Sequence, residues 1–60
     1  MNPVVKILMT RDGMAEQEAI DLVRETKEEL LRNDGWCADE IIMENLSLEP
    51  DYIMDILEID

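Results

Sequence analysis

Two apolar helical patterns separated by a proline occupy residues 38–57, ADEIIMENLSLEPDYIMDIL. In the first pattern the apolar residues recur at a spacing of three and four, which places them on one face of a helix. They are Ala38, Ile41, Ile42 and Leu46. This pattern predicts a helix over residues 36–46, whose apolar face must be covered by another element.

The second pattern begins at Pro50. Proline disfavours the helical conformation in the residue before it but suits the first position of a new helix. We therefore predict a second helix over residues 50–58, with Glu49 at its N-cap and Asp51 in its first turn, where carboxylates interact with the free amides. The two helices and the turn between them have helix-turn-helix geometry.

A longer helix is predicted over residues 15–33. Its apolar positions cover about half of the helical circumference, enough to contact two neighbours. They are Ala15, Ala19, Ile20, Leu22, Val23, Thr26, Leu30 and Leu31. Asn33-Asp34-Gly35 would end this helix, with Gly35 or Asn33 as the left-handed residue. The fold class is therefore mainly α, a small three-helix unit forming one domain over residues 1–60.

The N-terminal segment, residues 1–13, contains the run VVKILMT and ends at Gly13. Its β-branched residues favour a short strand or extended arm. A lone strand has no sheet to join, because even a hairpin is marginal in water. Three alternatives remain open: pairing with a symmetry mate, packing as an extended arm, or folding into the following helix.

Small size predicts self-association. A chain of this length buries roughly 60% of the surface exposed by its unfolded form, and the sequence has no Phe and no pair of cysteines. We therefore expect a homodimer in which the helix over residues 15–33 is buried. The single cysteine indicates a reducing, cytoplasmic setting. The apolar patch near the N-terminus is too short for a signal peptide or a membrane span.

Charge is distributed unevenly along the chain. The net charge is −11, and all five Lys and Arg residues lie before position 33. Residues 1–32 contain seven acids and five bases, a net of −2, whereas residues 33–60 contain nine acids and no base. Such a surface repels phosphate backbones and anionic membranes, so we expect a protein partner with a basic or apolar surface.

The sequence offers little material for catalysis. It contains no histidine, the residue most often used as a general base and a frequent metal ligand. Acid pairs such as Glu40 with Glu44 are expected by chance on an acidic helix, and Cys37 has acidic neighbours that disfavour the thiolate. We predict no enzymatic activity, no catalytic residue, no metal site and no cofactor.

Seven residues are candidates for partner binding: Trp36, Met43, Glu49, Asp51, Met54, Asp55 and Glu58. We expect Trp36 to be a partly buried anchor between two helices, with an exposed binding aromatic as the alternative. For the two methionines core filling is favoured over a partner-facing role. The helix over residues 50–58 carries acids where a DNA-reading helix needs Lys or Arg, which argues against DNA binding.

The ending LSLEPDYIMDIL resembles small acidic helical proteins encoded in bacteriophage and prophage genomes. The match is specific at Leu46, Leu48 and the run from Glu49 to Tyr52, with Ser47 where glycine is expected. The resemblance implies a phage setting without an assigned activity, and it transfers no site residue.

Two functions are compatible with these features. The first is a non-enzymatic protein–protein interaction module, a phage-encoded adaptor or regulator acting as a helical dimer. The alternative is an acidic nucleic-acid mimic that inhibits a host nucleic-acid-binding enzyme. Binding by a mimic should weaken steeply with salt, whereas an apolar contact should respond little.

Overall fold

The computed structural model describes residues 1–34 and 36–59. Its elements in chain order are α1 (Pro3–Asp12), α2 (Glu16–Arg32), α3 (Ala38–Leu46), the 3-10 helix η1 (Pro50–Tyr52) and α4 (Ile53–Leu57). The prediction of a mainly helical fold is confirmed, and none of the described residues lies in a strand.

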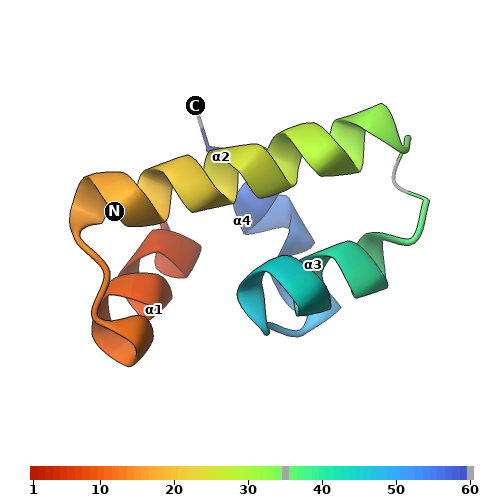
Figure 1. Ribbon diagram of the computed structural model, residues 1–60. Helices are drawn as coiled ribbons and strands as arrows, with labels where there is room; N and C mark the ends of the chain where they lie inside the picture. The colour runs from red at the N-terminus through yellow and green to blue at the C-terminus, as the bar shows by residue number, and fades with distance from the viewer. Residues whose placement is uncertain (35, 60) are drawn as a thin grey trace.

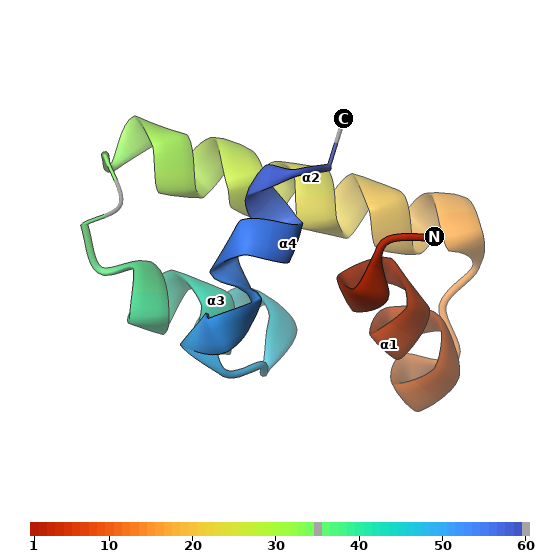
Figure 2. The ribbon, with the colours of Figure 1, turned by 180° about the vertical axis from the view of Figure 1, so that it is seen from behind.

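The longest helix, α2, forms one layer of the molecule, and the other helices pack against one side of it (Figure 1). Helices α1, α3 and α4 all contact α2. Seen from behind, α4 lies between α1 and α3 (Figure 2). The wide apolar face predicted for residues 15–33 therefore serves three neighbours in the same chain.

The N-terminal segment is a helix, so the predicted strand or extended arm over residues 1–13 is wrong. Asn2 caps α1, because its side-chain Oδ1 accepts from the backbone N–H of Val4 at 2.8 Å, and Pro3 occupies the first turn. At the other end Gly13 has φ +69° and its N–H donates to the Leu8 carbonyl. These end signals and burial on α2 outweigh the strand preference of the β-branched residues.

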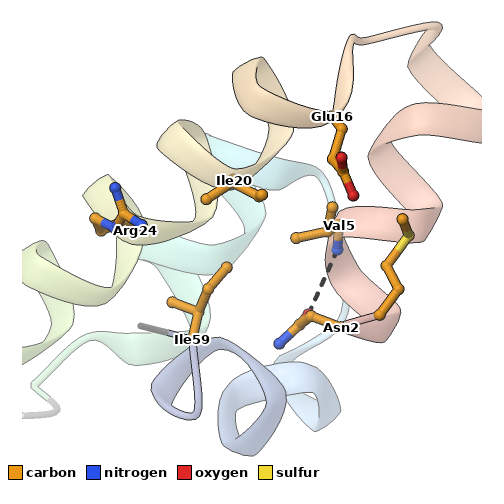
Figure 3. Close-up of a pocket in the computed structure, with 7 residues that line it drawn as sticks. Asn2, Val5, Glu16, Ile20, Arg24 and Ile59 are labelled. Atoms are coloured by element: carbon orange, nitrogen blue, oxygen red, sulfur yellow. Dashed lines mark hydrogen bonds between the residues drawn. The ribbon is translucent and has the colours of Figure 1, made fainter.

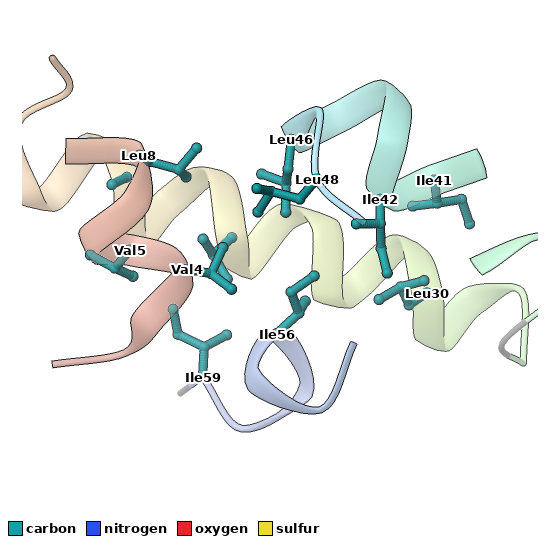
Figure 4. Packing of buried hydrophobic residues seen from close by; sticks show 12 residues of the cluster. Val4, Val5, Leu8, Leu30, Ile41, Ile42, Leu46, Leu48, Ile56 and Ile59 are labelled. Atoms are coloured by element: carbon teal, nitrogen blue, oxygen red, sulfur yellow. The ribbon is translucent and has the colours of Figure 1, made fainter. Parts of the chain in front are cut away.

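The hydrophobic core lies between α2 and the three shorter helices (Figure 4). Its buried members are Val4, Val5, Leu8, Ala19, Val23, Leu30, Ile41, Ile42, Leu46, Leu48, Ile56 and Ile59. Thr26 is buried among them, and its hydroxyl donates to the Leu22 carbonyl at 2.9 Å. The centre of the apolar face of α2, from Ala19 to Leu30, is covered within one chain. This centre therefore gives no reason to expect a dimer, and the dimer stays a prediction.

The junction between α2 and α3 differs from the predicted one. Asn33 has φ −98° and Asp34 takes the left-handed conformation with φ 52°, while Gly35 lies outside the described residues. Cys37 is also left-handed, with φ 59°. As a result α3 begins at Ala38, two residues later than the sequence pattern predicts.

The turn after α3 is held by a side chain from α1. Ser47 is left-handed, with φ 55°, and its N–H donates to the Met43 carbonyl at 2.9 Å. The guanidinium of Arg11 donates to the carbonyls of Leu46 at 2.7 Å and Ser47 at 3.1 Å. A positive group thus lies at the negative end of the α3 dipole.

The chain resumes a helical path at Pro50, as the proline predicts, but with a 3-10 turn before α4. Glu49 lies at the predicted N-cap position, although its side chain makes no capping hydrogen bond. Ile59 is attached to α2, because the Nζ of Lys27 donates to the Ile59 carbonyl at 2.6 Å.

Replacing Ser47 by glycine should stabilise the protein by up to about 1 kcal/mol, because glycine adopts a positive φ without the Cβ clash of other residues. The Ser47 side chain is exposed, so little packing is lost. Urea unfolding of the wild type and Ser47→Gly measures the change. The matched control is Ser47→Ala, which keeps a Cβ and should give no gain; a gain of the same size in both variants would disprove the explanation.

Candidate functional site

The predicted binding residues belong to the exposed surface of residues 36–58, which include α3, η1 and α4 and contribute no Lys or Arg. We call it the acidic surface, and its exposed carboxylates are Asp39, Glu40, Glu44, Glu49, Asp51 and Glu58. The inward-facing side chains of these helices, such as Ile42 and Ile56, are buried against α2. The carboxylates therefore occupy the positions that the core does not use.

Trp36 is exposed, so the prediction of a partly buried anchor is wrong. Its side chain is 76% exposed. Trp36 precedes the left-handed Cys37 and lies outside α3, so the helix does not bring its ring against α2. The alternative interpretation, an exposed aromatic side chain free to meet a partner, agrees with this position.

Met43 and Met54 are also exposed, at 57% and 64%, rather than filling the core. On α3, Met43 is separated by three positions from Glu40, which is its neighbour on the helix surface. On the next segment, Met54 lies three positions after Asp51 and four before Glu58. Each methionine is therefore an apolar side chain next to carboxylates.

Five of the predicted residues lie in one continuous segment, which runs from the N-cap of η1 to the C-cap of α4. They are Glu49, Asp51, Met54, Asp55 and Glu58. Asp55 differs from the other acids because it is only half-exposed and its backbone carbonyl accepts from the Asn2 amide at 2.7 Å. Met43 lies on α3 and Trp36 in the segment before it.

Sequence reasoning missed two exposed apolar side chains, Met1, which is 73% exposed, and Leu31, which is 58% exposed near the end of α2. Leu31 lies at the edge of the predicted apolar face. Leu31 follows the buried Leu30 by one position, about 100° around the helix, so its side chain is directed away from the core. The edge position in the sequence pattern is the signal that could have identified Leu31.

A carboxylate with a shifted pKa, Asp12, lies at the end of α1. The hydrogen bond from Arg11, at 2.9 Å, lowers the pKa of the Asp12 carboxyl and raises the pKa of the guanidinium. Both groups lie at the end of α1. No group of three or more metal-ligating side chains is found within residues 1–34 and 36–59.

Within the described part of the chain, every helix is too short or too polar to cross a lipid bilayer. Comparisons of the chain with protein-family models, with curated proteins and with solved structures found no match.

Proposed function

We propose that this protein is a non-enzymatic interaction module that acts as a dimer in the cytoplasm. We also propose a phage setting, because its C-terminal sequence resembles small acidic proteins encoded in phage genomes. Its partner is a protein segment that carries Lys or Arg around apolar side chains. The acidic surface, together with Met43, Met54 and Trp36, is the binding region. The role is that of an adaptor or regulator.

The observation that carries this proposal is the exposure of Met43 and Met54 beside carboxylates in a half of the chain without bases. Exposed methionines provide an adaptable apolar surface because their side chains are flexible and polarisable. Carboxylates around them favour basic partners and oppose acidic ones. Both features fit a partner that is amphipathic as well as positively charged.

The exposed methionines also distinguish this function from nucleic-acid mimicry. A mimic needs carboxylates in place of phosphates, but it has no need of apolar side chains between them. A nucleic-acid-binding enzyme binds its ligand chiefly through charge, and that binding falls steeply with salt. Contact with Met43 and Met54 would instead persist at high ionic strength.

The test is capture of the partner from a host lysate by tagged protein, with quantification by mass spectrometry. In the first variant the acids Glu49, Asp51, Asp55 and Glu58 are replaced by their amides. In the second, Met43 and Met54 are both replaced by serine. Each variant should reduce capture of the same partner at least about tenfold, since central interface residues account for most binding energy.

A matched control neutralises four exposed acids of α2, namely Glu18, Asp21, Glu25 and Glu28. It removes the same number of charges and should retain capture within about twofold. Full capture by both surface variants would disprove the proposal. Loss with the amide variant but not with the serine variant, together with release by salt, would favour the mimic.

A further inference from the structure

An acid, an apolar residue and a base follow one another along α2 and form a stripe beside α1 and Ile59 (Figure 3). Glu16, Ile20 and Arg24 are four positions apart and so share one face of the helix. Glu16 and Arg24 are exposed and Ile20 is half-exposed. With a rise of 1.5 Å per residue, the acid and the base lie about 12 Å apart along the axis.

An open pocket of about 220 Å³ lies next to this stripe. It is lined by Met1, Asn2, Val5, Glu16, Ile20, Arg24 and Ile59. Val5 and Ile59 are almost completely buried and provide apolar surface, whereas Met1 is 73% exposed at the rim. The pocket thus leaves room beside Ile20 for an additional apolar side chain.

We propose that this stripe is a self-complementary interface that binds a second copy of the chain. A two-fold axis passing near Ile20 sets two α2 helices antiparallel. Glu16 of each copy then lies opposite Arg24 of the other, and the two Ile20 side chains meet over the pockets. A two-fold interface must be complementary to itself, and an acid, an apolar residue and a base at equal spacing meet that condition.

The distribution of charge favours this face over the acidic surface. Residues 1–32 carry a net charge of −2, whereas residues 33–60 carry −9 without any base. Two copies that met through their acidic surfaces would place carboxylates against carboxylates, and such contacts are unfavourable. Across the α2 stripe Glu16 of each copy instead meets Arg24 of the other. Arg24 also retains its 3.8 Å contact with Asp21 of its own chain.

This inference rests on the dimer included in the proposed function and assigns its interface. It also leaves the acidic surface of both copies free, because that surface belongs to α3, η1 and α4. The dimer would then present two equivalent acidic surfaces to partners.

Charge reversal provides the test, with sedimentation equilibrium of the purified proteins at about 100 µM as the measurement. Glu16→Arg gives a stripe with two bases, and Arg24→Glu gives a stripe with two acids. Each single variant places like charges opposite each other and should weaken the homodimer at least about tenfold. An equimolar mixture should form a heterodimer, and the double variant E16R/R24E should recover the homodimer.

Glu25→Arg is the control, since Glu25 lies one position after Arg24 and thus about 100° away around the helix. It should dimerise like the wild type. Circular dichroism confirms that each variant is folded. A monomeric wild type would overturn both the interface and the dimer. A dimer equally strong in Glu16→Arg, Arg24→Glu and the wild type would overturn this interface alone; partner capture tests the acidic surface separately.

Discussion

The Leu8→Ala variant should lose about 2–5 kcal/mol of unfolding free energy, the range for removing most of a buried leucine side chain. Leu8 is completely buried where α1 packs on α2. A domain of this size is expected to be stable by only about 3–9 kcal/mol. The variant should therefore lose a large fraction of its stability and unfold at a clearly lower temperature and urea concentration than the wild type, as measured by circular dichroism.

Lys6→Ala is the matched control for Leu8→Ala, because Lys6 lies in the same helix and is exposed. Its unfolding free energy should change by less than about 0.5 kcal/mol. If residues 1–13 were a free arm, both variants would be nearly silent. Equal stability of the two would thus show that α1 does not contribute to the core.

The second large effect is expected at Asn2, whose side chain joins two helices. It caps α1 by accepting from Val4 at 2.8 Å, and its amide donates to the Asp55 carbonyl at 2.7 Å. Asn2→Ala removes both interactions and should cost about 1–3 kcal/mol, combining a lost N-cap with a lost hydrogen bond. Urea unfolding monitored by circular dichroism measures this loss.

Asn2→Asp separates the two roles of this side chain. Aspartate keeps a capping oxygen at the start of α1 but cannot donate to the Asp55 carbonyl. Its stability should therefore lie between those of the wild type and Asn2→Ala. If Asn2→Asp were as stable as the wild type, the bond to Asp55 would contribute nothing.

The sequence predicts the elements that rely on helical periodicity. The pattern over residues 15–33 matches α2, and Pro50 marks the renewed helix, because both signals act within a few residues. The sequence does not predict the first helix, because the β-branched residues of VVKILMT favour a strand and their helical conformation depends on packing against α2. Asn2, Pro3 and Gly13 are the local signals of this helix, since they form its N-cap, its first turn and its C-cap.

The candidate site was predictable in charge but not in shape. The absence of bases after Arg32 is a property of the sequence alone. The exposure of Trp36 depends instead on the left-handed Cys37 before α3, a backbone state that no local pattern signals. Met43 and Met54 lie at the edges of apolar stripes. Whether a side chain at such an edge is buried or exposed depends on how the neighbouring helices pack.

The hydrogen bond from Lys27 to the Ile59 carbonyl couples the unfolding of α4 to that of α2. Helix α4 has five residues, far fewer than an isolated helix needs in water. Its order thus depends on α2, through Lys27 and through the buried Ile56. Local unfolding of α4 would break its contacts with the middle of α2, namely the Lys27 hydrogen bond and the packing of Ile56. We therefore expect α4 to unfold together with the rest of the protein.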